Sequence, residues 1–343
     1  MYWTRRSKVL LIVLMLTLTL GAQERIRCMS YNAENLFDCI DDTLTNDDTF
    51  LPQATRHWTR NRYWNKLQAI GSAIAMAGED RAPDFVALCE VENDSVLHDL
   101  TRRSSLRTVR YNYLVTSSTD PRGIDVALLY KPIAYRPFAH KVLRLPSNQI
   151  DEGGYVRDVL CVSGELVTGD TLDVLVCHLP SRLNGRKSAR LRQRVVTHMC
   201  SAIDSLCSMR AMPHIVVMGD FNDDATDDSL VEVMGAKGDV KELEPGDFFN
   251  PYNEMLRAGL GTLAYQDEWN LFDNICVTEN LVNAEKGKLH IIKGKKFYGN
   301  IFTRPYMLQL EGQYKNYPLR TFVSNNFQDG YSDHFPVYIY IGK

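Results

Sequence analysis

The stretch VRDVLCVSGELVTGDTLDVLVC, residues 156–177, decides the fold class. It contains two apolar runs, residues 156–163 and 172–177, and each has the length and the β-branched content of a strand. No helical segment separates the two runs. Because parallel neighbours in a sheet need a long crossover, this stretch predicts antiparallel or mixed sheets and not a doubly wound parallel sheet.

The pattern on both sides of this stretch supports the same fold class. The run 126–130 also precedes residues 156–163 without an intervening helix. Residues 63–77 and 188–209 have the apolar spacing of amphipathic helices. Further strands are expected at residues 26–32, 85–89, 111–115, 214–218, 274–277 and 337–341. This order suggests an α+β domain in which sheets pack on each other and helices lie outside them.

The composition is that of a globular protein. The chain has 343 residues, of which 45% are hydrophobic and 24% charged, and these values exclude wholesale disorder, a coiled-coil rod and a collagen-like fibre. The formal charge is −3, and Arg5, Arg6 and Lys8 contribute three of the 39 basic residues. Without those three, 36 basic residues face 42 acidic ones. Bulk charge therefore does not recruit a nucleic acid to this protein.

The N-terminal residues predict export. The basic residues near the start precede an apolar run, residues 9–20, which ends at the small pair Gly21 and Ala22. This layout is typical of a cleavable secretory signal and is short for a membrane span, although an uncleaved anchor helix is the alternative. We expect residues 1–22 to be a signal peptide. Residues 23–343 are expected to form one domain, a monomer that is periplasmic or extracellular and has no stable membrane insertion after signal cleavage.

The eight cysteines do not suggest a disulfide framework. Cys200 and Cys207 are seven residues apart on a predicted helix, too far along its axis to bond each other. No CxxC pair and no Cys/His cluster with zinc spacing occurs in the sequence. Five others lie within apolar, strand-like runs: Cys28, Cys89, Cys161, Cys177 and Cys276. We therefore expect most of the thiols to be free and in the core.

Polar side chains recur where apolar strands end. The residues at this position are Asn32, Glu34, Glu90, His178, Asp220 and Asn222, and a further pair, Asp333 and His334, precedes the terminal strand. Each alone has an ordinary explanation, since an Asp after a strand is usually a turn residue and a lone His is usually structural. Together, carboxylates with an amide suit a hard cation, and two histidines suit proton handling or contact with a phosphoryl group. The set fits Mg²⁺ held partly by water and substrate oxygens.

These residues lie in motifs that resemble one family. The segments SYNAENLFD, PDFVALCEVEN, RGIDVALLY, HLPSR, GDFN, FDNI and SDHFPV occur in this order between residues 29 and 337. The set closely resembles the endonuclease/exonuclease/phosphatase superfamily, which includes deoxyribonucleases, apurinic endonucleases, neutral sphingomyelinases and inositol-polyphosphate phosphatases. The resemblance implies a four-layer α/β/β/α sandwich of two mixed, mainly antiparallel sheets flanked by helices, with the site at one sheet edge.

The resemblance also implies a metal site. Glu90 resembles the family's metal-binding glutamate, and Asn32 its asparagine near the metal and the phosphate. Glu34 lies where some members have an Asp near the metal, so it is a ligand or a neighbour of one. Asp333 resembles the aspartate beside the family's histidine and is a further candidate for holding the metal. The expected ion is Mg²⁺, with Mn²⁺ as the alternative.

The remaining motif residues are expected to perform the reaction. Asp220 resembles the aspartate that orients or deprotonates the attacking water, and Asn222 the amide that contacts the phosphate. His334 resembles the histidine at the scissile phosphate, with Asp273 accepting its ring N–H. His178 lies at a strand end where apurinic endonucleases lack a histidine and where deoxyribonuclease-like and phosphatase-like members have one.

Arg122 is a candidate for the substrate phosphate, and the alternative is a solvated loop arginine. Aromatic and basic residues between positions 279 and 330 either contact a base or head group or form a strand pair over the sheet edge. The sequence thus predicts a secreted, Mg²⁺-dependent phosphodiesterase with DNA or RNA as the leading substrate. The alternatives are a phosphomonoesterase or a phospholipid or sphingomyelin phosphodiesterase, and then a non-catalytic binding protein on the same scaffold.

Overall fold

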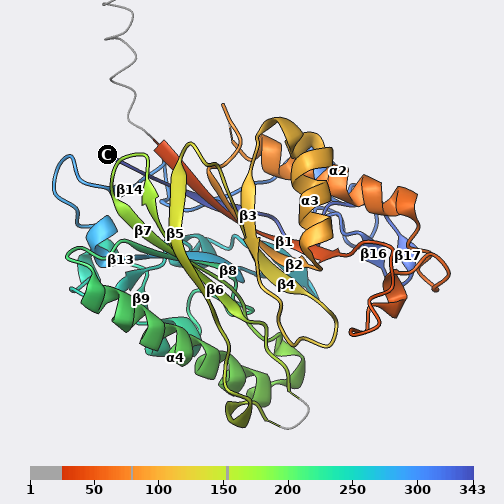
Figure 1. Cartoon of the computed structure of the whole chain (residues 1–343), viewed down its shortest axis with the longest axis horizontal. Helices are drawn as coiled ribbons and strands as arrows, with labels where there is room; N and C mark the ends of the chain where they lie inside the picture. The colour runs from red at the N-terminus through yellow and green to blue at the C-terminus, as the bar shows by residue number, and fades with distance from the viewer. Residues whose placement is uncertain (1–24, 79, 152–153) are drawn as a thin grey trace, which may run out of the picture.

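The structure is a computed structural model that describes residues 25–78, 80–151 and 154–343. The predicted signal peptide, residues 1–22, lies outside the described residues. Two β-sheets lie face to face between two helical layers (Figure 1). Within the described part of the chain, no helix is both long and apolar enough to cross a membrane.

The first sheet has seven strands and is mainly antiparallel. Its order is β14-β18-β1-β2-β4-β3, with β15 also paired to β18. Only β1 and β2 run parallel in this sheet as described. The strands are β1 (Arg25–Leu36), β2 (Phe85–Val91), β3 (Asn112–Val115), β4 (Asp125–Tyr130), β14 (His290–Ile292), β15 (Asn300–Ile301) and β18 (Val337–Gly342).

The second sheet also has seven strands and mixes both directions. Its order is β5-β6-β7-β8-β13-β10-β9, in which β7 with β8 and β10 with β9 are the parallel pairs. The strands are β5 (Tyr135–Leu143), β6 (Val159–Leu166), β7 (Thr171–His178), β8 (Ile215–Asp220), β9 (Ala236–Lys237), β10 (Phe248–Phe249) and β13 (Asp273–Thr278). Two small hairpins complete the strands: β11 (Leu263–Tyr265) with β12 (Glu268–Asn270), and β16 (Phe322–Val323) with β17 (Asn326–Phe327).

Two long helices form crossovers between strands that pair in parallel. Helix α2 (Arg60–Met76) lies between β1 and β2 in the sequence, and helix α4 (Arg186–Met209) lies between β7 and β8. Figure 1 shows α4 on one side of the sheets and α2 with α3 (Asp94–Arg103) on the other. A short helix, α5 (Asn253–Arg257), follows β10. The predicted α+β sandwich of two mixed, mainly antiparallel sheets flanked by helices is therefore confirmed.

The stretch that decides the fold class forms the antiparallel pair β6–β7, in which Leu160 lies opposite Val176. The sequence pattern placed the start of this first strand too early. Strand β6 begins at Val159, because Arg157 and Asp158 before it are buried and engaged in ion pairs. Burial of a charge is stable only with such partners, so these residues interrupt the ladder.

Three apolar layers hold the sandwich together. The central layer lies between the sheets and includes Phe85 of β2, Val174 of β7 and Val216 of β8. One outer layer packs α2 and α3 on the first sheet, and the other packs α4 on the second sheet. The predicted apolar face of α4 is buried in this second outer layer: Leu191, Val195, Met199, Ile203 and Leu206.

All eight cysteines are free, as expected for most of them, and the five in the predicted strands are buried. Burial raises the pKa of the Cys28, Cys89 and Cys177 thiols. Raised thiol pKa values leave little thiolate, so these groups behave as small apolar side chains.

Gly219 explains why a glycine precedes Asp220 at the end of β8. Its φ is +154°, and a Cβ built there would lie 1.8 Å from the carbonyl oxygen of Cys177 on the parallel neighbour β7. No side chain fits at that distance, because the obstacle is backbone. The glycine therefore permits the close approach that places His178 beside Asp220.

We expect Gly219→Ala to lower the free energy of unfolding by about 1–3 kcal/mol, since the strands must separate to admit the methyl group. Urea unfolding monitored by circular dichroism measures this change. Gly169→Ala is the matched control, because Gly169 has φ +82° but no atom within 4 Å of the added carbon. An equal loss in both variants would contradict the clash and leave only backbone strain.

Candidate active site

Ends of strands from both sheets meet at one edge of the sandwich. In the second sheet His178 lies opposite Asp220, and Asp220 lies opposite Asp273. Asn32 belongs to β1 of the first sheet, and its Nδ2 donates to Oδ2 of Asp220 over 2.9 Å. This bond joins the two sheets. The structure thus brings four of the predicted site residues together.

Asp220 is buried at the centre of this group. Its Oδ1 accepts the backbone N–H of Asn222 over 2.8 Å, and its Oδ2 accepts the amide of Asn32. Burial raises the pKa of Asp220, and with the opposing effect of His334 and the further effect of Asp273 the pKa reaches about 7. The carboxyl group therefore changes charge close to neutral pH, which suits a group that exchanges a proton with water.

His334 is fixed by contacts to two other segments. Its Nδ1 lies 2.7 Å from Oδ2 of Asp273, and its backbone N–H donates to Oγ of Ser332 over 3.1 Å. The Ser332 hydroxyl in turn donates to the carbonyl oxygen of Asn32 over 2.7 Å. Burial by itself lowers the pKa of His334, but the adjacent Asp273 carboxylate outweighs it and holds the pKa well above 6.5. His334 is therefore an imidazolium at neutral pH.

His178 has the opposite protonation state. Its Nε2 lies 3.5 Å from Oδ2 of Asp220 and 3.9 Å from Oε1 of Glu90. Burial lowers the pKa of His178 well below 6.5, and the charges of Arg157 and Arg122 lower it further. His178 is thus a neutral imidazole. Two histidines on either side of one carboxylate therefore hold different charges.

Glu90 ends β2 with its backbone in the left-handed region, at φ +62°. Its Oε2 accepts the backbone N–H of Asn35 over 2.9 Å. In the described part of the chain, no Lys or Arg forms an ion pair with this carboxylate, and His178 is its nearest basic partner. Arg122 attracts the Glu90 carboxylate electrostatically but forms no ion pair with it. A rim carboxylate whose oxygens are free of a direct Lys or Arg ion pair suits a hard metal ion that keeps several waters.

Glu34 and Asp333 are arranged differently from Glu90. Oε2 of Glu34 accepts the backbone N–H of Thr321 over 2.6 Å and lies 3.7 Å from Nζ of the buried Lys66. Arg320 joins the two carboxylates, with Nη2 at 2.8 Å from Asp333 and Nε at 3.5 Å from Glu34. Both predicted metal ligands therefore already have cationic partners.

The predicted acidic ligands do not converge on one point. Among the described residues, three acidic, His or Cys ligand atoms lie within 4.8 Å of one another only at Asp41, Asp47 and Asp48, away from the motifs. Glu90, Glu34 and Asp333 do not form such a group. A metal held mainly by protein carboxylates does not fit this edge, whereas an ion with few protein ligands does.

Arg122 and Asn222 lie at the rim. Nη2 of Arg122 is 3.3 Å from Oδ2 of Asp120, its side chain is 39% exposed, and its guanidinium lies over the ring of Tyr155. Asn222 has φ +49°, and its Nδ2 donates to the carbonyl oxygen of Leu179 over 2.9 Å. The Asn222 amide thus spans the ends of β8 and β7 and leaves its Oδ1 free of a protein donor.

Two buried cations support the site and were absent from the sequence prediction. Arg157 donates from Nε to the carbonyl oxygen of His178 over 3.1 Å and pairs through Nη1 with Asp120, the partner of Arg122. Lys66 pairs with Glu34. The signal for Arg157 was present, since a charged residue within an apolar run must find a partner. Lys66 gave no signal, because it resembles any polar residue of an amphipathic helix.

An aromatic cluster includes Phe335, the residue that follows His334 in the sequence. The ring of Phe335 stacks on Trp269 of β12 with centroids 6.1 Å apart, and Tyr317 meets Trp269 edge-on at 5.7 Å. Of these rings, Trp269 is 37% exposed. The segment 279–330 contributes Tyr317 to this cluster, and it also contains the short pair β16–β17.

The sequence of this chain matches the model of the endonuclease/exonuclease/phosphatase family over residues 27–343. The chain belongs to this family, whose enzymes hydrolyse phosphate esters and generally use divalent metal ions. A comparison with curated protein sequences gives no significant match.

Solved structures share the fold at low sequence identity. A Bacteroides thetaiotaomicron endonuclease/exonuclease/phosphatase family protein has a TM-score of 0.57 at 15% identity, over 93% of this chain and 98% of that one. D. rerio TDP2, complexed with a single-strand DNA product, has a TM-score of 0.55 at 14% identity, over 93% and 100%. The human Nocturnin catalytic domain, with a bound sulfate anion, has a TM-score of 0.54 at 14% identity, over 93% of both chains.

Proposed function

We propose that this protein is a Mg²⁺-dependent phosphodiesterase that cleaves nucleic acid by in-line attack of water. The observation that carries the proposal is the buried Asp220 carboxylate, which lies between a neutral His178 and a cationic His334. Environments that shift the pKa values of neighbouring titratable groups in opposite directions are characteristic of acid–base sites. A purely structural carboxylate has no need of two histidines in different charge states.

Asp220 is proposed to align and deprotonate the attacking water. The bonds from Asn32 and Asn222 fix both of its oxygens, so the carboxylate does not rotate. A fixed base removes orientational freedom from the attack and so lowers the barrier. Its pKa of about 7 allows it to accept a proton from water near neutral pH.

The two histidines are proposed to act on the phosphoryl group. His334, held as a cation by Asp273, compensates the charge that develops on the phosphoryl oxygens and protonates the departing alkoxide. His178 remains neutral and donates one N–H to a phosphoryl oxygen. Arg122 and Asn222, at the rim, are proposed to contact the same group.

Glu90 and Asn32 are the residues proposed to hold the divalent ion, Mg²⁺ or alternatively Mn²⁺. Among the described residues, Glu90 forms no direct ion pair with a Lys or Arg, although Arg122 attracts it electrostatically, and the Oδ1 of Asn32 accepts the N–H of Glu34. When bound, the ion supplies neutralisation of phosphoryl oxygen charge. Glu34 and Asp333 are assigned to holding Arg320 at the edge of the site.

Nucleic acid is favoured as the substrate by two features. The partly exposed ring of Trp269, which packs on Phe335, the residue after His334, is proposed to stack on a base. A structural relative, D. rerio TDP2, is complexed with a single-strand DNA product. The proposal extends to an exported, monomeric, single-domain enzyme; the basic and apolar pattern of residues 5–22 supports export.

The test is hydrolysis of bis-p-nitrophenyl phosphate and p-nitrophenyl phosphate with Mg²⁺, with Mn²⁺ and with EDTA, followed by single- and double-stranded oligonucleotides. Diester cleavage that EDTA prevents, together with oligonucleotide cleavage, is the expected result. A preference for the monoester would favour a phosphomonoesterase instead, and cleavage of sphingomyelin alone a lipid phosphodiesterase. Absence of hydrolysis on every substrate would favour a non-catalytic binding protein.

Asp273→Asn is expected to reduce diester hydrolysis at pH 8 about 10²-fold, at the lower end of the effect of one acid–base group. The carboxylate of Asp273 raises the pKa of His334, so its removal lowers that pKa and shifts the alkaline limb of the rate profile to lower pH. A rate profile from pH 5 to 10 measures the shift. The exposed Asp204→Asn is the control, and an unmoved alkaline limb in Asp273→Asn would remove His334 from the acid role.

A further inference from the structure

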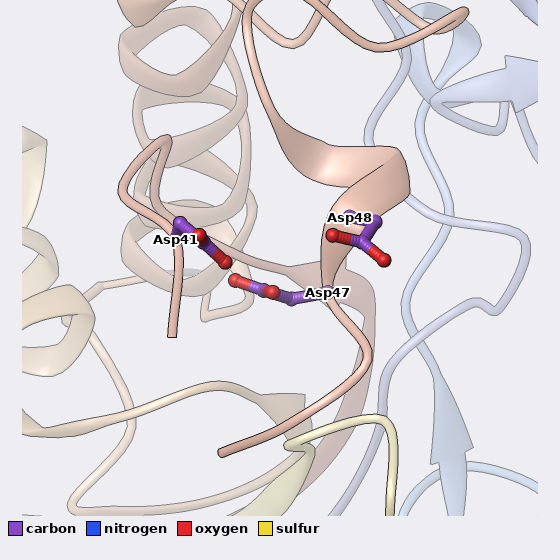
Figure 2. Close-up of side chains that lie close together, drawn as sticks. All are labelled: Asp41, Asp47 and Asp48. Atoms are coloured by element: carbon purple, nitrogen blue, oxygen red, sulfur yellow. The ribbon is translucent and has the colours of Figure 1, made fainter. Parts of the chain in front are cut away.

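A second acidic cluster lies in the connection between β1 and α2, outside the proposed active site. One carboxylate oxygen from each of Asp41, Asp47 and Asp48 lies within 4.8 Å of the other two. Figure 2 shows the Asp47 side chain directed toward Asp41, with Asp48 on the next turn of the chain. Asp41 and Asp48 are exposed, whereas Asp47 is only 2% exposed.

Asp47 has a buried oxygen without a partner. Its Oδ2 accepts the backbone N–H of Asp42 over 3.1 Å, but its Oδ1 is buried and has no hydrogen bond within the described residues. A buried carboxylate oxygen left unsatisfied destabilises a fold by the full cost of removing it from water. Burial accordingly raises the pKa of Asp47. A buried carboxylate with one unpartnered oxygen, and with an oxygen within 4.8 Å of carboxylate oxygens of Asp41 and Asp48, indicates a missing positive ligand.

No positive side chain compensates the cluster. Across the described ranges, none of Asp41, Asp42, Asp47 and Asp48 forms an ion pair with a Lys, Arg or His. Oδ1 of Asp42 instead accepts the backbone N–H of Leu44 over 3.0 Å. This bond orders the loop but does not neutralise its negative charge. Four aspartates within eight residues therefore repel one another unless a cation binds between them.

We propose that Asp41, Asp47 and Asp48 hold a hard divalent cation of the Ca²⁺ type, separate from the ion of the proposed active site. Carboxylate oxygens on an irregular loop match the ligand class and the flexible coordination that Ca²⁺ accepts. The two exposed aspartates leave room for water to complete the coordination. The buried oxygen of Asp47 supplies the one ligand that solvent does not already satisfy.

The site lies against the loop that holds Arg122. The backbone N–H of Asn46 donates to the carbonyl oxygen of Pro121 over 2.6 Å, and the Thr45 side chain packs so closely on Gly123 that an added Cβ would lie 2.9 Å from its Oγ1. A cation that orders residues 41–48 would therefore also order the turn beside Arg122. The role assigned to the ion is to stabilise this rim of the protein, and it does not depend on whether the proposed reaction occurs.

The test is Ca²⁺ titration of the full chain by calorimetry and by thermal unfolding, in a Glu90→Gln background that removes the proposed catalytic ion ligand. We expect Ca²⁺ to raise Tm in this background and the double variant Asp41→Asn/Asp47→Asn to lose both the heat of binding and the rise in Tm. In EDTA, the double variant should be at least as stable as its parent, because repulsion between carboxylates is relieved. Asp204→Asn, an exposed acid on α4, is the matched control.

Two results would overturn the proposal. One is unchanged Ca²⁺ binding and an unchanged rise in Tm in the double variant, which would place the ion elsewhere. The other is no binding of Ca²⁺ by the Glu90→Gln parent at millimolar concentration. Neither readout uses hydrolysis, so failure of this site and failure of the proposed phosphodiesterase activity are distinguishable.

Discussion

Replacing Asp220 with asparagine is expected to lower the kcat of diester hydrolysis by about 10³-fold, the effect of losing a positioned general base. The asparagine keeps the size of the side chain and one acceptor oxygen, which can retain the bond from either the Asn32 amide or the Asn222 N–H. The variant should therefore fold normally, while no group at position 220 accepts a proton from water. Steady-state kinetics on bis-p-nitrophenyl phosphate, with circular dichroism to verify folding, measures this effect.

The same carboxylate sets the acid limb of the wild-type rate profile. Because burial raises the pKa of Asp220 to about 7, its base form is lost as the pH falls through that value. Activity should therefore decrease on acidification below about pH 7, and binding of a divalent cation nearby would move this limb to lower pH. Asp220→Asn should show no such limb. An acid limb that persists in Asp220→Asn would assign the titration to another group.

His334→Gln is expected to reduce kcat about 10²-fold or more, because it removes the imidazolium that stabilises developing charge and protonates the leaving group. Glutamine can still accept or donate a hydrogen bond but carries no charge. The loss should be greatest for substrates with poor leaving groups, such as a dinucleotide, and smaller for a p-nitrophenyl ester.

The control for this variant is His140→Gln, which changes an exposed histidine on β5. Equal losses for the dinucleotide and the p-nitrophenyl ester would contradict a proton-donating role for His334. They would leave charge compensation as its contribution, since that effect does not depend on the leaving group.

Much of the fold follows from the sequence because the relevant signals are local. The apolar runs ending at Asn32, Cys89, Cys177 and Met218 identified strands, and the absence of a helix between residues 163 and 172 required an antiparallel pair. Strand β5 was not predicted, since five consecutive residues of it, 138–142, are exposed at the edge of the sheet and give no apolar run. An exposed edge strand lacks the buried apolar residues by which a strand is recognised in a sequence.

The sequence predicted the residue types of the candidate site, but not the ion pairs that join them. The sequence predicted Asp220 and His178 at the ends of two strands. In the structure these strands, β7 and β8, pair in parallel with His178 opposite Asp220, so the two side chains are neighbours. Glu34 forms ion pairs with Lys66 and with Arg320, and Arg320 is more than 250 residues away in the sequence. No local sequence pattern predicts these pairs. Protonation states were also beyond the sequence, because they depend on burial and on which charges become neighbours after folding.

The position of β18 in the first sheet has a consequence for the order in which this protein becomes active during synthesis. Strand β18 pairs with β1, β14 and β15, so the sheet that begins at residue 25 cannot be completed before residue 342 has been made. His334 and its support Ser332 immediately precede that strand. Contacts of such long sequence separation form late. A chain whose second sheet has formed would therefore have Asp220 and His178 in place but not His334, the proposed acid, so the proposed activity would begin only when the final strand docks.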